Sequence, residues 1–148
     1  GSGLSVDAIV SDFLAGAVEQ MIPAAADDHW DVIEGQGALV HPAFAGVTLG
    51  LLHGAQPQAF VVCHEAGRET LSGFGTHPVG GIAQIIALTK SLCSWFPHEI
   101  ACVGLCINTS RLDEAEARAY LTREAAEHGV PACDPVRFGV EEIVEGLR

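Results

Sequence analysis

The chain has few cations for its length. Its 148 residues include 7 lysine and arginine residues against 19 aspartate and glutamate residues, which gives a formal net charge of −12. Proteins that bind nucleic acid neutralise phosphates with clustered cations, and an anionic membrane surface attracts the same kind of cluster. The composition therefore argues against nucleic acid and against a membrane surface as partners.

Long apolar runs and paired cysteine motifs are also missing. No apolar run reaches the roughly 18–20 residues of a membrane-spanning helix, and no secretory signal is visible. The five cysteines lie in apolar segments without a CxxC pair. Buried thiols in a reducing compartment explain this usage best, so we expect a cytoplasmic protein. Cys102 and Cys106 fall in a predicted strand, and we predict no metal ligands.

The phosphate-binding and nucleophile motifs of common enzyme classes are absent. The chain contains neither GxxxxGK[ST] nor GxGxxG, and the pairs Gly73/Gly75 and Gly80/Gly81 are too short to replace them. No serine stands in a GxSxG context, which argues against a hydrolase of that type.

Apolar runs and amphipathic stretches alternate along the sequence. Strands are predicted at Trp30–Ile33, Ala59–Cys63 and Ile100–Ile107, with a short fourth one near Val136. Helices are predicted over residues 6–22, 44–53, 79–95, 112–128 and 140–147. This alternation predicts an α/β fold in which a mainly parallel sheet has helices on both faces. We expect residues 1–148 to form one such domain.

The stretch from Trp30 to Pro42 is the most informative one. The predicted strand Trp30–Ile33 leads into Glu34, the glycines Gly35 and Gly37, and then His41. Glycine allows a tight turn and a close approach of a ligand, and ligands of open α/β sheets bind beyond the carboxyl ends of the strands. The loop is thus a candidate site, although a sharp turn with an exposed carboxylate would give the same pattern.

Two further predicted strands end in polar residues. The second is followed by His64, Glu65 and Arg68, and the third by Asn108, Thr109 and Ser110. In a parallel sheet these ends lie along one edge, where a pocket can form. Arg68 can hold a carboxylate or phosphate there, or simply pair with Glu65 or Glu69.

Three segments together resemble a known family. They are Asp31-Val-Ile-Glu-Gly-Gln-Gly-Ala-Leu-Val-His-Pro42, Gly50-Leu-Leu-His-Gly54 and Val61-Val-Cys-His-Glu65 with Arg68. They are similar to the C-terminal domain of a bacterial family that includes D-glutamate (D-amino-acid) N-acetyltransferases, and more distantly to dethiobiotin synthetase. The resemblance implies a three-layer sandwich that is P-loop NTPase-like but lacks the phosphate-loop strand. It also implies a fragment of a longer protein.

The resemblance further implies a reaction and a set of roles. Acetyl-CoA would donate an acetyl group to the amine of D-glutamate or a related D-amino acid. The residues assigned on this basis are Glu34 and His41 as catalytic, Gln36, His64 and Arg68 as substrate-binding, and Gly35, Gly37 and Asn108 as cofactor-binding.

Two other functions stay open at this point. The chain could belong to a ligase or kinase of the dethiobiotin synthetase type that uses ATP, with Glu34 on Mg²⁺. It could also be a non-catalytic assembly module. In each case one edge strand of the sheet would lack a pairing partner, and such an edge promotes aggregation unless another segment pairs with it or covers it. We therefore expect an N-terminal portion or another chain as partner, and we expect a homo-oligomer.

Overall fold

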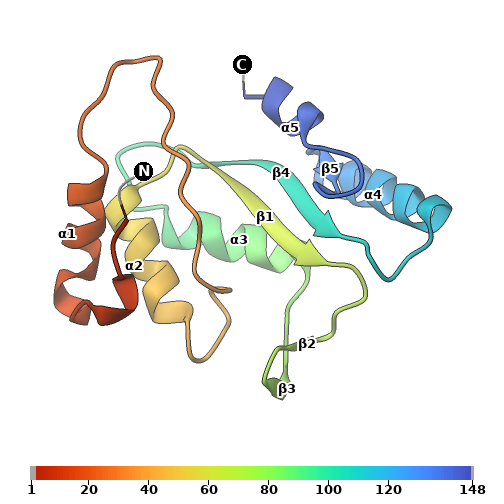
Figure 1. The fold of residues 1–148 in the computed structure, drawn as a ribbon, viewed down its shortest axis with the longest axis horizontal. Coiled ribbons are helices and arrows are strands. Elements are labelled where there is room, and N and C mark those ends of the chain that lie inside the picture. Colours follow the sequence, from red (N-terminus) through yellow and green to blue (C-terminus); the bar gives the residue numbers. More distant parts are fainter. Residues whose placement is uncertain (1–2, 148) are drawn as a thin grey trace. The chain divides into compact units, whose positions relative to one another are not determined.

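The computed structural model describes residues 3–147, and the chain divides into two compact units (Figure 1). The first unit runs to Pro57 and includes the short segment Trp95–Pro97. The second unit comprises Gln58–Ser94 and the chain from His98 onward. Each unit has its own architecture and is described separately.

The first unit is built on two helices that pack against each other. They are α1, Ser11–Met21, and α2, Ala45–Ala55, and a short 3-10 turn, Val6–Ala8, precedes them. Two glycines of α2 make the close approach possible. A Cβ atom at Gly50 would run into the side chain of Leu14, and one at Gly54 would meet the carbonyl oxygen of Ala15. These positions therefore accept no larger residue without separating the helices.

The predicted strand Trp30–Ile33 is not a strand in the structure. The segment has no regular secondary structure, and the side chain of Val32 is 95 % exposed. A strand is stable only when its backbone pairs with a neighbour, and no described strand pairs with this stretch. Glu34 consequently lies within a long loop rather than at a strand end.

The second unit contains a parallel sheet, as the sequence predicted. Its strands are β1, Ala59–Glu65, β4, Ala101–Asn108, and the short β5, Ala132–Cys133, in the order β1-β4-β5. Both pairings are parallel. The apolar runs of β1 and β4 suit a sheet that is buried on both faces. The α/β class with a mainly parallel sheet is thus confirmed.

Helices pack on both faces of this sheet, although Val61 and Cys63 of β1 are exposed on the face opposite the main core. The helices α3, Ile82–Leu92, and α4, Glu114–His128, contribute to the main core together with β1 and β4. Its buried members are Val62, Ala66, Ile82, Leu105, Ile107 and Leu121. The third helix, α5, Glu141–Glu145, packs on the other face, because a Cβ atom at Gly104 would lie 2.6 Å from Ile143 Cδ1.

A small hairpin after β1 was not predicted. It consists of β2, Thr70–Leu71, and β3, Phe74–Pro78, which pair antiparallel within a segment interpreted as a loop. Gly73 turns the chain between them with a φ of +77°. The glycine turn explains why the hairpin forms. The polar residues of the hairpin do not show the apolar pattern that would predict strands.

Three cysteines form a row across the sheet. Cys63 of β1 is the register partner of Cys106 of β4, which in turn is the partner of Cys133 of β5. All five cysteines of the chain are free thiols. Burial, together with the neighbouring thiols, raises the pKa of Cys106 to about 12.

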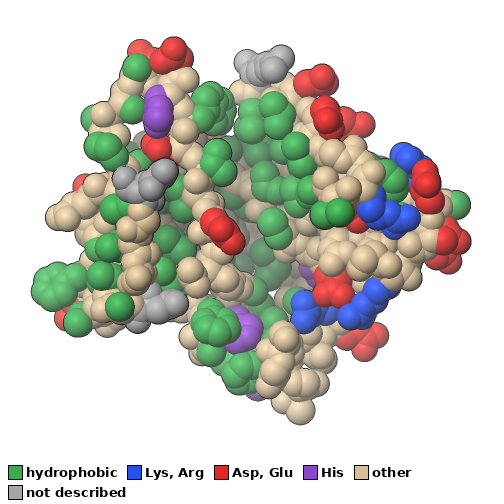
Figure 2. Space-filling model, viewed as in Figure 1, with side chains coloured by type: hydrophobic (Ala, Val, Ile, Leu, Met, Phe, Trp, Pro, Cys, Tyr) green, Lys and Arg blue, Asp and Glu red, His purple; other side chains and the backbone are tan. Residues whose placement is uncertain are grey.

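Hydrophobic and acidic side chains share the surface (Figure 2). The large exposed hydrophobic residues include Phe13, Trp30, Val32, Trp95 and Val136. Among residues 3–147 no helix is both long enough and apolar enough to cross a membrane.

Candidate functional site at the carboxyl end of the sheet

The two longest strands end side by side in polar residues. Glu65 of β1 is the register partner of Asn108 of β4. Asn108 accepts a hydrogen bond on its Oδ1 atom from the backbone N–H of Ser110 at 2.9 Å, which turns the chain away from the sheet. The predicted convergence of strand ends is therefore observed for β1 and β4.

Glu65 gathers two arginines at this edge. Arg68 Nη1 lies 2.9 Å from Glu65 Oε2, and Arg111 Nη2 lies 2.9 Å from Glu65 Oε1. The carboxylate is mostly buried, whereas the side chain of Arg111 is 66 % exposed. Two guanidinium groups on one carboxylate leave a net positive charge at the surface. In this acidic chain, such a pair is a place where an anion can bind.

Arg68 is held in place by its own backbone surroundings. Its Nε atom donates to the carbonyl oxygen of Thr70 at 3.3 Å, and Gly67 turns the chain before it with a φ of +74°. Of the two alternatives left open by the sequence, the structure shows that Arg68 pairs with Glu65, and binding of a ligand by Arg68 stays a prediction. The Arg68 side chain is still 38 % exposed, so an incoming carboxylate can reach it.

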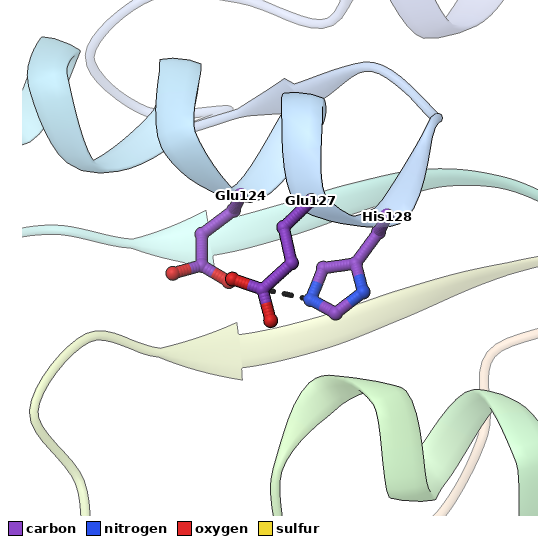
Figure 3. Close-up of side chains that lie close together, drawn as sticks. All are labelled: Glu124, Glu127 and His128. Carbon is purple, nitrogen blue, oxygen red and sulfur yellow. Dashed lines mark ion pairs between the residues drawn. The ribbon is translucent and has the colours of Figure 1, made fainter.

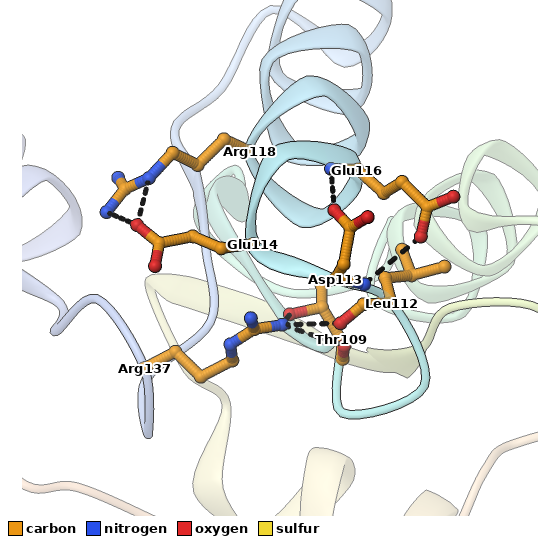
Figure 4. Close-up of polar contacts among 7 residues, drawn as sticks. All are labelled: Thr109, Leu112, Asp113, Glu114, Glu116, Arg118 and Arg137. Atoms are coloured by element: carbon orange, nitrogen blue, oxygen red, sulfur yellow. Dashed lines mark hydrogen bonds and ion pairs between the residues drawn. The ribbon is translucent and has the colours of Figure 1, made fainter.

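A network of hydrogen bonds supports the loop that follows β4, and Figure 4 shows the part of it formed by Thr109, Leu112 and Arg137. Asp134 is 2 % exposed and accepts hydrogen bonds from the backbone N–H and the hydroxyl of Thr109, at 2.8 and 2.6 Å. Arg137 Nη1 donates to the carbonyl oxygens of Thr109 and Leu112, at 3.0 and 3.1 Å. The network fixes the backbone between β4 and α4, and with it the base of Arg111.

The charge of Asp134 is stabilised by these donors. Burial alone would raise the pKa of Asp134, but the hydrogen bonds from Thr109, Arg137 and Val136 outweigh it and lower the pKa. Neither Asp134 nor Arg137 was predicted as a functional residue. The visible signal in this part of the sequence was a short apolar stretch, which predicted only a strand.

His64 lies on the core side of β1. Burial lowers the pKa of His64, and the positive charge of Arg68 acts in the same direction, while Glu124 and Glu65 oppose it. At neutral pH the imidazole therefore carries a free electron pair. A neutral histidine can accept a proton or a hydrogen bond from a ligand.

The remaining predicted residues belong to the first unit. Glu34, Gly35 and Gln36 are exposed in the loop between α1 and α2. Gly37 exchanges two hydrogen bonds with Thr48, because its N–H donates to the hydroxyl at 3.1 Å and its carbonyl accepts from it at 2.7 Å. These bonds tie the end of the loop to α2.

His41 has a different setting from the exposed loop residues. It is 8 % exposed and stacks on Phe44 with a centroid distance of 4.6 Å. Its Nδ1 atom accepts a hydrogen bond from the N–H of Ala43 at 3.2 Å, and its carbonyl accepts one from the N–H of Ala45. This arrangement shapes the start of α2.

The structure groups the predicted residues into two sets. His64, Arg68 and Asn108 come from the carboxyl end of the sheet in the second unit. Glu34, Gln36, His41 and the two loop glycines come from the first unit. The arginine cluster of Glu65, Arg68 and Arg111 is the feature best built for binding a ligand.

Comparison with known proteins identifies the family. A family model described as a domain of unknown function (DUF1611_C), P-loop domain, matches residues 1–144. The chain belongs to the DUF1611 family. The match covers both compact units, and it agrees with the resemblance found in the sequence.

Relatives of the chain carry a more specific name. A D-glutamate N-acetyltransferase from Pseudoalteromonas sp is 42% identical over 99% of this chain, and one from Tritonibacter scottomollicae is 40% identical over the same share. The chain spans 44% of the length of each. The crystal structure of a DUF1611 family protein from Anabaena variabilis ATCC 29413 is 35% identical, with a TM-score of 0.88, over 99% of this chain and 43% of that one.

Proposed function

We propose that this chain is part of an N-acetyltransferase that moves the acetyl group of acetyl-CoA to the amine of D-glutamate or a related D-amino acid. The support is twofold. Relatives at 42% and 40% identity bear the name D-glutamate N-acetyltransferase. The arginine cluster offers the positive charge that a dicarboxylate substrate needs in an otherwise acidic protein.

The observation that carries the proposal is the exposed part of the arginine cluster. Glu65 neutralises only one of the two guanidinium groups, so Arg68 and Arg111 together retain one positive charge. A planar guanidinium matches the two oxygens of a carboxylate. In our proposal, Arg68 binds a carboxylate of the amino acid, and His64 provides a further hydrogen bond to it. Gln36 keeps the substrate-binding role that the resemblance assigns to it.

The reaction requires a base and a displaced thiolate. The substrate ammonium loses a proton to the base, and the freed nitrogen attacks the carbonyl carbon of the thioester. The carbon–sulfur bond then breaks, and the proton that the nitrogen gives up as it becomes an amide passes to the leaving thiolate, which gives free coenzyme A. We assign the base to Glu34, with His41 as the other candidate. Gly35, Gly37 and Asn108 are the proposed contacts of acetyl-CoA.

The first test measures coenzyme A release by the intact protein with D-glutamate and with L-glutamate. We expect release with D-glutamate, and a fall in kcat of about 10²–10⁴-fold in Glu34→Gln, because that is the usual contribution of a general base. Absence of release from the wild-type protein, or equal kcat values for wild type and Glu34→Gln, would contradict the assignment.

The second part of the test separates substrate binding from chemistry. Arg68→Ala should raise the KM for D-glutamate by about 10–100-fold, equivalent to about 1.4–2.7 kcal/mol, and leave the KM for acetyl-CoA unchanged. Arg68→Lys should retain part of the binding because the charge remains. Arg118→Ala is the matched control, since Arg118 pairs with the exposed Glu114 on α4 and should change neither constant.

A nucleotide-dependent ligase or kinase is the second candidate. The family description names a P-loop domain, which favours it, whereas the sequence contains no phosphate-binding loop motif. Mg²⁺-dependent ATP binding by the intact protein, without coenzyme A release, would favour this candidate over the acetyltransferase.

A further inference from the structure

A second group of chemically active side chains lies on α4 and is not part of the arginine cluster. Glu124, Glu127 and His128 follow one another at the i, i+3 and i+4 positions, so their side chains leave the helix on the same side (Figure 3). Each offers one donor atom, and these donor atoms all lie within 4.8 Å of one another. The proposed acetyl transfer uses none of the three residues.

Two of the three side chains are largely withdrawn from water. The Glu124 side chain is 10% exposed and the His128 side chain 8%. His128 Nε2 lies 3.4 Å from Glu124 Oε2. Two donors that bind one zinc-sized ion at about 2.0–2.1 Å in a tetrahedral arrangement are about 3.4 Å apart. The pair is therefore already spaced as two neighbouring ligands of one ion.

The surroundings prepare Glu124 for this role. Arg123 Nη2 binds Glu124 Oε1 at 2.9 Å, which leaves Oε2 directed at His128. Such outer partners orient a metal-binding carboxylate.

The third ligand brings a second negative charge to the same place. Glu127 is exposed and can turn its carboxylate toward the pair by a change of rotamer. Two carboxylates beside one imidazole repel each other, and a divalent cation between them would replace that repulsion with attraction. Arg123 already balances the charge of Glu124, so the charge of Glu127 is the one that a bound cation would balance.

We propose that Glu124, Glu127 and His128 form a binding site for one divalent transition-metal ion of the Zn²⁺ or Co²⁺ kind. The imidazole disfavours Mg²⁺ and Ca²⁺, which prefer oxygen ligands alone, and the absence of sulfur disfavours Cu⁺. Three protein ligands leave at least one coordination position for water or another small ligand.

Titration of metal-free, untagged protein with Co²⁺ tests this site. We expect one equivalent to bind and to produce visible absorption between about 500 and 650 nm, as low-coordinate Co²⁺ does with mixed nitrogen and oxygen ligands. Zn²⁺ should displace it and abolish the absorption. Glu127→Gln should weaken Co²⁺ binding at least about tenfold, since even outer-shell changes cost 10–100-fold.

The variants distinguish a loss of metal binding from a loss of folding. Glu127 is exposed, so Glu127→Gln should leave the far-UV circular dichroism and the melting temperature of the metal-free protein unchanged. His128→Asn provides the second loss of a ligand. Glu114→Gln makes the same substitution near the start of the same helix and should bind Co²⁺ like the wild type. Failure of the wild-type protein to bind Co²⁺, or unchanged binding by Glu127→Gln, would overturn the proposal.

Discussion

A single carboxylate, Asp134, organises the backbone beyond the carboxyl end of β4. It receives four hydrogen bonds, from the N–H and hydroxyl of Thr109 and from the N–H groups of Val136 and Arg137. Replacing this acceptor with an amide leaves at least one donor without a partner in a buried place. A donor in that position costs about 1–3 kcal/mol.

The Asp134→Asn variant should therefore lose about 2–4 kcal/mol of unfolding free energy at pH 7, because a buried charged network is broken. Urea unfolding measures this loss. The exposed Asp28→Asn variant is the control, for which we expect a change of about 0.5 kcal/mol or less.

The same loss should depend on pH in a defined direction. The folded pKa of Asp134 lies below its ordinary value of 3.8, so its stabilisation is complete above about pH 4 and declines as the pH falls through the folded value. The difference between wild type and Asp134→Asn should shrink over that range. A difference that is constant from pH 7 to pH 3 would contradict this account.

The polar site was only partly predictable, for a reason visible in its residues. The spacing of Glu65 and Arg68 indicated that they could pair, and the structure confirms it. Arg111 joins them from a loop far along the chain, and no local pattern indicates such a contact. Asp134 likewise finds Thr109 through the parallel pairing of β4 and β5. The roles of Glu34 and His41 stay predictions.

Among the elements, the helix pair of the first unit depends on two glycines. The helix predicted over residues 44–53 continues through Gly54 to Ala55 and ends in the left-handed residue Gln56, with a φ of +43°. Gly54 is instead a contact point with α1, where its missing Cβ leaves room for Ala15. A helix interior normally disfavours glycine, so the close packing explains its presence.

Gly54→Ala should push α1 and α2 apart and lower the unfolding free energy by about 1–3 kcal/mol, as overpacking of a core does. Gly46→Ala is the matched control, because the Cβ position at Gly46 in the same helix is open. There the exchange should stabilise the protein by about 0.4–1 kcal/mol. Chemical denaturation measures the change in unfolding free energy of each variant, and we expect the two changes to have opposite signs. Changes of the same sign would contradict the packing argument.

The sequence predicted those helices and strands well whose local pattern of residues is sufficient to define them. The runs behind β1 and β4 are fully apolar, and α4 begins at Asp113 with a capping box and ends at Gly129 in a left-handed conformation. The stretch Trp30–Ile33 is short and interrupted by Asp31, and its interpretation as a strand was wrong because strand formation depends on a partner. Local pattern carries no information about that partner.

At the scale of the whole molecule, the net charge of −12 destabilises the compact folded state through repulsion between like charges. Like charges repel over distances that salt shortens, so raising NaCl from about 20 to about 200 mM should raise the melting temperature by about 2–5 °C at pH 7. Scanning calorimetry measures this change in melting temperature. At pH 4.7, near the isoelectric point, the same addition should have little effect. An equal increase at both pH values would point away from charge repulsion.

The row of Cys63, Cys106 and Cys133 has a consequence for how the protein withstands oxidants. Peroxide and alkylating reagents react with the thiolate form, and burial keeps Cys106 and Cys133 protonated at neutral pH by raising the pKa of each. Sulfur atoms on adjacent strands thus lie side by side without being reactive. Cys63 is exposed in the folded chain, but its pKa is raised as well. Unfolding, which restores ordinary thiol acidity and uncovers Cys133, would make the row more open to crosslinking, so an oxidant should damage the unfolded chain first.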